Sequence, residues 1–196
     1  MKRLNLERLK DIARTHSIKY EILRPRSRRV IATRMSRTFN APQRRMYEIV
    51  AKLEDHDKLL SHCNKATVVD KTGLEHIIPN NQFIVVSDVN EGGSKLAISR
   101  YTMSPPRRID EDLMTDPFPA KGVRDRKDGK ISWVFRRVGR GSCKMICQSE
   151  FEVATGKVFV RGLIDHVWMS FFENMMVEVG ELRAEDMLTE PSIRRS

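Results

Sequence analysis

The sequence predicts an α+β domain in which a curved antiparallel sheet of six to seven strands packs on one long carboxyl-terminal helix. Between residues 65 and 153, apolar and polar residues alternate with a period of two, and short turn-like breaks separate the segments. From about Lys157 onward the apolar period changes to three and four, which is typical of a helix. Two short helical segments follow the first predicted strand. The order of elements favours helices gathered on one face of a sheet.

The long helix is predicted from about Lys157 to Met187, a stretch without proline. Such a helix spans about 45 Å at 1.5 Å per residue, so much of it needs an apolar surface to lie against. Its polar face carries too many charges for a membrane span, and its seam is not a strict coiled-coil heptad. The apolar face consists of Val160, Leu163, Ile164, Val167, Trp168, Phe171, Phe172, Met175, Met176, Val179 and Leu182.

The first strand is predicted from about Val30 to Phe39. Pro42 then starts a short helix, because proline is favoured in a first helical turn. A second short helix is expected from about Asp55 to His62. The breaks between the later strands are short, which favours antiparallel neighbours. These strands are expected at Ala66–Lys71, Gln82–Val89, Lys95–Met103, Arg108–Met114, Ile131–Val138 and Cys143–Val153.

Positive charge is concentrated near the amino end. Of the 196 residues, the first 46 hold 14 Lys and Arg against three acids, and the rest hold 22 against 23. A basic arm on a neutral body indicates a polyanion, an anionic membrane surface or an import signal. Residues 4–13 form a basic amphipathic pattern that an organelle presequence would also show. We therefore expect a basic arm at residues 1–27, one domain at 28–187 and a loose tail at 188–196.

The candidate anion-binding residues are arginines of this arm and of the following strand and helix. No aromatic residues are interleaved with them, so contact with a nucleic-acid backbone is expected rather than base stacking. They are Arg24, Arg26, Arg28, Arg29, Arg37, Arg44 and Arg45.

Motifs for catalysis or metal binding are missing from the sequence. The five histidines are well separated, and no paired-cysteine or phosphate-binding glycine motif occurs. Cys143 and Cys147 share a strand face but would lie roughly 13 Å apart, too far for a disulfide or one metal ion. Three cysteines without a secretory leader favour a reducing compartment. We expect no transmembrane segment, no catalytic residue, no metal and no enzyme activity.

Several short segments, in this order, resemble the START-like or polyketide-cyclase superfamily, also called helix-grip proteins. The likeness extends from about Arg28 to Glu185 and is closest to the mitochondrial coenzyme Q-binding protein and its bacterial relatives named ribosome-association toxins. Asp116 stands where that family has glycine, and the basic arm has no counterpart. The segments are Tyr47-Glu48-Ile49-Val50, Glu54-Asp55, Ser99-Arg100-Tyr101, Ser104-Pro105-Pro106-Arg107-Arg108-Ile109, Asp116-Pro117-Phe118, Trp133-Val134-Phe135, Phe151-Glu152-Val153 and Arg183-Ala184.

The resemblance implies a helix-grip fold with an apolar cavity between the sheet and the long helix. Such a cavity would hold ubiquinone or a similar isoprenoid lipid without catalysing a reaction and would support respiration. No cofactor is required, and ubiquinone is the expected carried ligand. Aromatic and methionine side chains between a sheet and a helix also commonly form a plain core. The expected cavity-lining residues are Trp133, Phe135, Phe151, Leu163, Val167, Phe171 and Met175.

Three functions compete at this point. The first is a quinone or lipid carrier of the coenzyme Q-binding type, located in the mitochondrial matrix or on the matrix face of the inner membrane. The second is a ribosome-associated or mitoribosomal protein, in which the domain is a rigid module and the basic arm lies on rRNA. The third, a cyclase-like enzyme, ranks below both. A large assembly, either the mitochondrial ribosome or a respiratory complex, is the expected partner that holds the arm.

Overall fold

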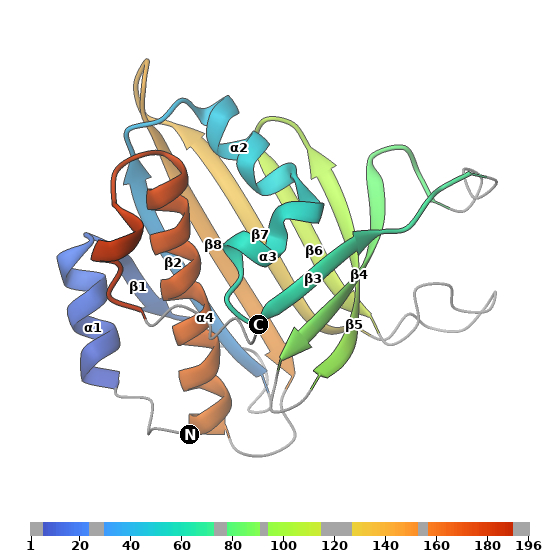
Figure 1. Cartoon of the computed structure of the whole chain (residues 1–196), viewed down its shortest axis with the longest axis horizontal. Helices are drawn as coiled ribbons and strands as arrows, with labels where there is room; N and C mark the ends of the chain where they lie inside the picture. Colours follow the sequence, from blue (N-terminus) through green and yellow to red (C-terminus); the bar gives the residue numbers. More distant parts are fainter. Residues whose placement is uncertain are drawn as a thin grey trace.

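The protein has an α+β fold, as predicted, with a curved antiparallel sheet and a long helix near its carboxyl end (Figure 1). The computed structural model describes residues 6–23, 30–72, 78–90, 94–114, 127–152 and 157–189. The strands are β1 (Lys19–Ile22), β2 (Val30–Phe39), β3 (Cys63–Val68), β4 (Gln82–Asn90), β5 (Ser94–Ser104), β6 (Arg108–Met114), β7 (Lys127–Arg137) and β8 (Cys143–Glu152). The α-helices are α1 (Leu6–Thr15), α2 (Gln43–Ala51), α3 (His56–Leu59) and α4 (Lys157–Glu178), and the 3-10 helices are η1 (Leu53–Asp55) and η2 (Ala184–Asp186).

The described sheet has eight strands in the order β1-β2-β8-β7-β6-β5-β4-β3, so the predicted count of six to seven is corrected. The additional strand is β1, which pairs antiparallel with β2 from Lys19 opposite Ser36 to Ile22 opposite Thr33. A four-residue strand within a basic segment lacks the apolar alternation that identifies the others. The first predicted strand, by contrast, has the bounds of β2.

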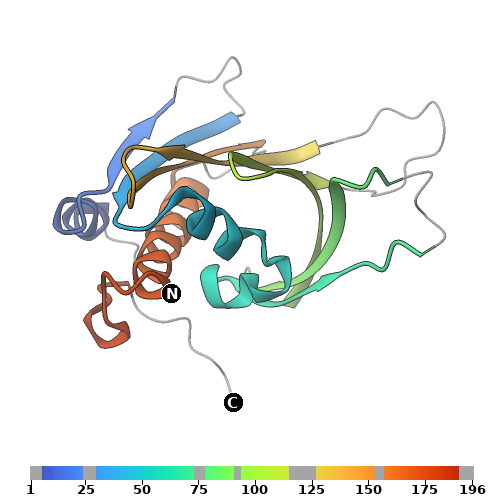
Figure 2. The same cartoon turned by 90° about the horizontal axis from the view of Figure 1, so that it is seen from above.

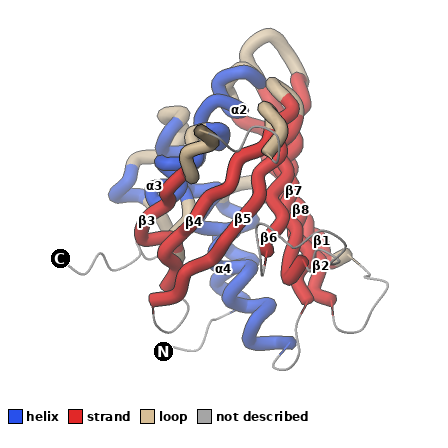
Figure 3. Tube along the Cα trace, turned by 90° about the vertical axis from the view of Figure 1, so that its right-hand side faces the viewer, coloured by secondary structure: helices blue, strands red, loops and turns tan. Residues whose placement is uncertain are grey.

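The curved sheet encloses α2, α3 and α4 on its concave side (Figure 2), and the helices lie on one side of the sheet in Figure 3. Alternate strand residues point to this side, because successive side chains in a strand face opposite ways. The inward set includes the fully buried Phe39, Trp133 and Phe135, and α4 contributes Phe171 and Phe172. These side chains form the main core cluster.

Helix α4 ends at Glu178, nine residues before the predicted end at Met187. The reason is Gly180, whose φ of 77° lies in the left-handed region that a helix cannot continue through. The amide of Gly180 donates to the Val177 carbonyl at 3.0 Å, and that of Glu181 donates to the Met176 carbonyl at 2.8 Å. These two bonds form the glycine-based Schellman ending.

Residues 6–23, which the sequence assigns to a basic arm, pack against the rest of the fold. Helix α1 lies beside α4 (Figure 1) and buries Leu9, Ile12 and Ala13, while Ile18 is buried next to it. Residues 167–173 of α4 are consequently all buried, with the sheet on one side and α1 on the other. The boundaries proposed at residues 27 and 187 stay a prediction.

Glu173 of α4 connects both ends of the chain. Its side chain is 0% exposed, and its carboxylate accepts a hydrogen bond from Nε2 of His16 at 2.9 Å. It also accepts from the amides of Leu188 at 2.7 Å and Thr189 at 2.8 Å, and from the Thr189 hydroxyl. A buried carboxylate with several donors is well satisfied. This group, which we call the Glu173 junction, therefore ties α1 and the carboxyl-terminal segment to one turn of α4.

Candidate functional site

The centre of the concave face is an aromatic cluster around Trp133. The ring of Tyr101 stacks on Trp133 with centroids 6.1 Å apart and planes at 10°. His56, Trp168 and Phe171 surround the same indole at centroid distances of 6.1, 6.2 and 6.3 Å. The members come from β5, β7, α3 and α4, so the cluster joins both walls of the fold.

Most of the residues predicted to line a cavity are packed core residues in this structure. Trp133 is 0% exposed and Phe171 1%, so no water-sized space adjoins either ring. Phe135 lies further toward α2, edge-on to Tyr47 at 5.7 Å. Leu163 lies on the part of α4 whose side chains are not described. The structure therefore buries Trp133, Phe135, Val167, Phe171 and Met175, and leaves Phe151 half-buried.

Half-buried apolar side chains gather at one end of the concave face. Phe151 and Leu113 face inward on either side of Gly129, to which both are paired across the strands. A Cβ at Gly129 would lie 2.6 Å from Cδ1 of Phe151 and 3.0 Å from Cδ1 of Leu113, so the missing side chain lets the two close over the backbone. Phe83 on β4 is also inward-facing and half-buried, but it lies in the row of Tyr101 and Glu111, and Nζ of Lys71 is 3.9 Å from its ring centroid. We call Leu113, Gly129 and Phe151 the apolar rim.

A polar cluster lies next to Trp133, and sequence reasoning missed it. Glu111 on β6 is 5% exposed and faces Tyr101, its direct partner on β5. Its Oε1 accepts a hydrogen bond from the Ser99 hydroxyl at 2.7 Å. The signal was present in the sequence, because Glu111 is in phase with the apolar Ile109 on a predicted strand.

His56 completes this cluster, and its partners define its tautomer. Its Nε2 lies 2.8 Å from the Val50 carbonyl oxygen, which can only accept, so Nε2 carries the proton. The Nδ1 atom is then free of hydrogen and accepts from the Tyr101 hydroxyl at 3.3 Å. His56 falls within the second short helix expected from the sequence, and it begins α3. Its imidazole also orients the Tyr101 hydroxyl.

Burial determines the charge of each group in the cluster. Desolvation raises the pKa of Glu111 to about 7, although Ser99 and Tyr101 stabilise its ionised form. Burial, and then the neighbouring Glu111 charge, raises the pKa of Tyr101 well above its usual value. Burial lowers the pKa of His56, which keeps the imidazole neutral near pH 7. A carboxyl that titrates near neutral pH in an apolar interior is typical of functional sites.

Three buried polar atoms near this cluster have no hydrogen-bond partner among the described residues. They are Oε2 of Glu111, Nε1 of Trp133 and Nδ1 of His62. Burial also lowers the pKa of His62 to about 4. An unmet hydrogen-bonding group in an interior costs about 1–3 kcal/mol. Such groups call for a functional explanation.

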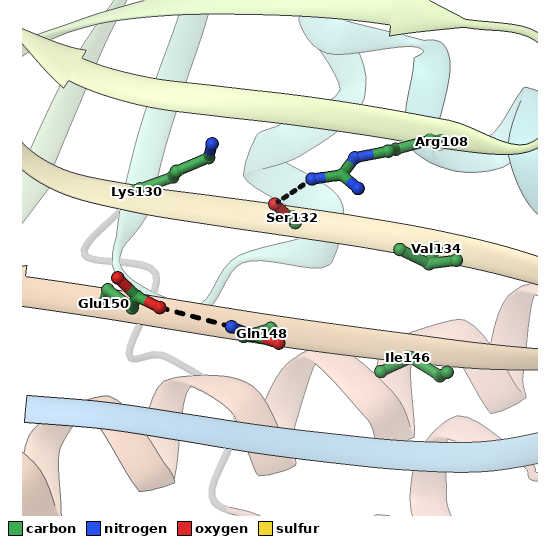
Figure 4. A pocket seen from close by; sticks show the side chains of 7 residues that line it. All are labelled: Arg108, Lys130, Ser132, Val134, Ile146, Gln148 and Glu150. Carbon is green, nitrogen blue, oxygen red and sulfur yellow. Dashed lines mark hydrogen bonds between the residues drawn. The ribbon is translucent and has the colours of Figure 1, made fainter. Parts of the chain in front are cut away.

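A hollow of about 230 Å³ lies on the opposite, outer face of the sheet (Figure 4). Arg108 bonds Asp110 at 2.6 and 2.8 Å, and Gln148 bonds Glu150 at 3.2 Å. Most of the residues lining the hollow are charged or polar, so the concave face is the better candidate for an apolar ligand. The hollow is lined by Arg108, Lys130, Ser132, Val134, Ile146, Gln148 and Glu150.

The predicted anion-binding arginines do not form one described surface. Arg37 donates to the His16 carbonyl at 2.7 Å and pairs with Glu181, so it holds α1 and the turn after α4 together. Arg44 is exposed on α2 and pairs with Glu48 at 2.7 Å, and Arg45 beside it is exposed. The remaining four, Arg24, Arg26, Arg28 and Arg29, lie outside the described residues.

The three cysteines, Cys63, Cys143 and Cys147, are buried free thiols. Burial raises the pKa of Cys63 to about 11 and that of Cys147 well above the usual value. Within the described ranges, no group of three or more His, Cys, Asp or Glu side chains could hold a metal ion. No helix among the residues searched is long and apolar enough to span a bilayer.

Solved structures share this architecture. The Zhui aromatase/cyclase from Streptomyces matches with a TM-score of 0.53 at 12% identity, over 76% of this chain and 95% of that chain. A START superfamily protein from Mycobacterium smegmatis matches with a TM-score of 0.57 at 13% identity, over 76% and 97%. The chain has a START-like/polyketide cyclase fold. The predicted helix-grip architecture is thereby supported, whereas the coenzyme Q and ribosome assignments gain nothing from these matches.

The di-domain aromatase/cyclase StfQ of the steffimycin biosynthetic pathway matches with a TM-score of 0.59 at 11% identity, over 78% of this chain and 51% of that chain. The chain thus spans about half of that protein. Because aromatase/cyclases share its fold, the expectation that the protein is not an enzyme is corrected. Identities of 11–12% show the fold and transfer no activity. No protein-family model and no curated protein matches the sequence.

Proposed function

We propose that the protein binds an apolar ligand between the concave face of the sheet and α4, entering over the apolar rim. The observation that carries this proposal is the rim, where the inward-facing Leu113 and Phe151 keep part of their surface exposed. Apolar side chains turned toward an interior normally lose this surface to neighbouring groups. Half-buried inward residues therefore favour a site that an apolar molecule completes.

The proposed ligand is an isoprenoid lipid, with ubiquinone as the specific candidate, and the proposed role is support of respiration. Transfer of each methylene out of water contributes about 0.8 kcal/mol, so a chain of ten carbons contributes about 8 kcal/mol before the cost of association is subtracted. The interior beyond the rim is packed around Trp133, so a long chain would extend along α4 rather than past that ring. The mitochondrial location is part of this proposal and rests on the sequence resemblance.

A quinone titration tests the proposal, because both tryptophans of the chain, Trp133 and Trp168, lie in the aromatic cluster. Decylubiquinone is expected to quench their fluorescence saturably. Phe151→Asp, which places a charge at the rim, is expected to weaken binding at least tenfold. Leu96→Asp is the matched control, since Leu96 is 75% exposed on the outer face. Equal affinity of the Phe151 variant and wild type would refute the site.

The fully buried Trp133 and Phe171 are poor positions for this test, because a charge at either would unfold the core. Phe151 is half-buried, so its variant can be checked for a wild-type unfolding transition before binding is measured. Lipid extracted from the purified protein and identified by mass spectrometry provides an independent measurement.

The alternative proposal, a ribosome-associated protein with the arm on rRNA, is favoured by the excess of positive charge in residues 1–46. Truncation of residues 1–27 is not a clean test of it, because Leu9, Ile12 and Ile18 belong to the core. Replacement of Arg24, Arg26, Arg28 and Arg29 by Gln removes the charge and leaves those core residues in place. If the ribosomal alternative is right, this four-arginine variant should bind RNA more weakly and with less dependence on salt than wild type. If the lipid proposal is right, its affinity for quinone should be unchanged.

A further inference from the structure

Positive charge gathers at the end of the sheet where β7 and β8 are joined. From Gly129 to Ser149 the chain carries five Lys and Arg residues and no acid, and four of the five lie in the β7–β8 hairpin. The hairpin reaches the top of Figure 1. Arg136 and Lys144 are direct partners across the two strands. The Cβ atoms of such partners are about 4.5–5.5 Å apart, and like charges at this spacing destabilise a sheet.

Helix α2 and the β5–β6 turn add cations to the same end. The Gln43 side-chain amide donates to the Phe135 carbonyl at 2.7 Å, and the Phe135 amide donates to the Arg107 carbonyl at 2.8 Å, so both segments lie beside β7. Arg44 and Arg45 are exposed in the first turn of α2, where the helix dipole disfavours positive charge. That turn has no acid and no side-chain cap. We call the following seven cations the basic end: Arg44, Arg45, Arg107, Arg136, Arg137, Arg140 and Lys144.

The basic end is not neutralised within the described part of the chain. There, only Arg44 has a carboxylate partner, Glu48 at 2.7 Å. Arg137 donates to the Gly139 carbonyl at 3.3 Å, a contact that leaves its charge uncompensated. Residues 47–196 hold 22 Lys and Arg against 23 acids, so the excess here comes from placement rather than from composition. Surface contacts that break local rules for stability indicate a functional site.

From this placement we infer that the basic end binds the phosphate backbone of a nucleic acid. Six of its seven cations are arginines, whose guanidinium groups form paired hydrogen bonds with phosphate oxygens. They extend over three neighbouring segments, as contact with a row of phosphates requires. The aromatic side chains of these segments, Tyr47, Trp133 and Phe135, are buried, so bases have no ring to stack on. This inference is independent of the proposed apolar ligand.

An anionic bilayer is the other polyanion to which such a surface could bind, and two features disfavour it. The hairpin exposes one large apolar side chain, that of Val138 at 61%, whereas segments that lie on a bilayer insert a larger apolar face. Gly129 of the apolar rim and Arg137 are near opposite ends of β7, about 26 Å apart at 3.3 Å per residue. A bilayer at the basic end would therefore not reach the rim.

Fluorescence anisotropy with a labelled RNA duplex of 20 base pairs tests the inference on the full chain. The hairpin variant combines Arg136→Gln, Arg140→Gln and Lys144→Gln. Loss of three phosphate contacts should weaken binding at least tenfold at 100 mM salt. It should also reduce the slope of log affinity against log salt concentration by about 2–3, since each contact contributes about 0.9. Duplexes of different sequence should bind wild type equally.

A matched control removes the same charge from exposed positions on α1, α3 and β3, away from the basic end. It combines Arg14→Gln, Lys58→Gln and Lys65→Gln. The control should change RNA affinity by less than threefold. In urea unfolding the hairpin variant should be as stable as wild type or more stable, because it removes the repulsion between β7 and β8. A destabilised hairpin variant would contradict that repulsion.

Three outcomes overturn the inference, and none of them bears on the quinone titration. Equal losses of RNA affinity in the hairpin and control variants would show that net charge alone explains binding. A hairpin variant that binds RNA as wild type does would exclude the basic end. Hairpin-dependent cosedimentation with phosphatidylserine vesicles, without binding of the RNA duplex, would assign the surface to a membrane.

Discussion

Replacement of Glu173 by Gln tests whether the Glu173 junction holds both ends of the chain to α4. The variant keeps the size of the side chain and removes its negative charge. It also places an NH₂ group where one of the two oxygens accepted hydrogen bonds. Each carboxylate oxygen faces two hydrogen-bonding groups. Oε1 faces the His16 ring and the Leu188 amide, and Oε2 faces the amide and the hydroxyl of Thr189. Whichever way the amide points, one backbone amide loses its acceptor, because the Thr189 hydroxyl and the His16 ring can turn to accept from the new NH₂ group.

The expected cost follows from these contacts. A hydrogen bond to a charged group contributes about 1.5–3 kcal/mol, and the carboxylate is 0% exposed, so water does not replace the lost acceptor. The loss of one such bond gives a destabilisation of about 1.5–3 kcal/mol. That is a large fraction of the 5–15 kcal/mol that is typical of a domain. Glu178→Gln, at an exposed position of the same helix, should change stability by less than about 0.5 kcal/mol.

Urea unfolding measures these differences through the midpoint at constant slope. Amide hydrogen exchange should in addition show faster exchange of α1 and of Leu188 and Thr189 in the Glu173 variant, while β7 and β8 keep their protection. A destabilisation below about 1 kcal/mol, or exchange that rises uniformly through the chain, would refute the role assigned to the junction.

Three further changes have defined outcomes. Gly180→Ala, at a φ of 77°, should lower the free energy of unfolding in urea by about 1 kcal/mol. Gly141→Ala, at a position with open space and no positive φ, should leave it unchanged. Equal effects of the two variants would contradict the helix-ending argument. Gly129→Ala should cost about 1–3 kcal/mol by crowding Phe151, and most of this cost should vanish in a Phe151→Ala background; additive effects would rule the contact out. The folded pKa of Glu111, about 7, lies above its ordinary 4.5, so its stabilising contribution is complete below pH 4.5 and is lost as pH rises through 7. Wild type should therefore lose about 3 kcal/mol relative to Glu111→Gln between pH 4 and pH 8, and a constant difference would show an ordinary carboxyl.

Periodicity in the sequence was sufficient for the elements that carry the core. Strand β2 has the predicted bounds from Val30 to Phe39, and β6 has those from Arg108 to Met114. The end of α4 was predicted too late in the chain, although Gly180 marks it. The reason is that apolar residues at helical spacing continue to Leu182, and the prediction followed this spacing rather than the glycine. β1 was missed because its pairing with β2 depends on a contact distant in sequence rather than on its own composition.

The candidate site was predictable only in its apolar part. Trp133 and Phe171 were predicted to line one cavity between the sheet and the long helix, and in the structure their ring centroids are 6.3 Å apart within the packed core. Glu111 was overlooked although its phase on β6 points it inward. The pKa of its carboxyl depends on Ser99, Tyr101 and the surrounding burial, which no local pattern contains. Similarly, nothing near Arg37 in the sequence indicates that Glu181 would pair with it.

The central position of β8 beside β2 has a consequence for how the chain acquires its structure. Their paired residues, from Phe39 with Cys143 to Val30 with Glu152, are more than 100 positions apart. Such distant pairings raise the contact order of the fold, and the logarithm of the folding rate falls as contact order rises. During synthesis, α1, β1 and β2 therefore emerge long before β8 and α4, the elements on which they pack. This amino-terminal fifth of the chain keeps its apolar surface uncovered until α4 leaves the ribosome, which makes the nascent chain a natural client for chaperones.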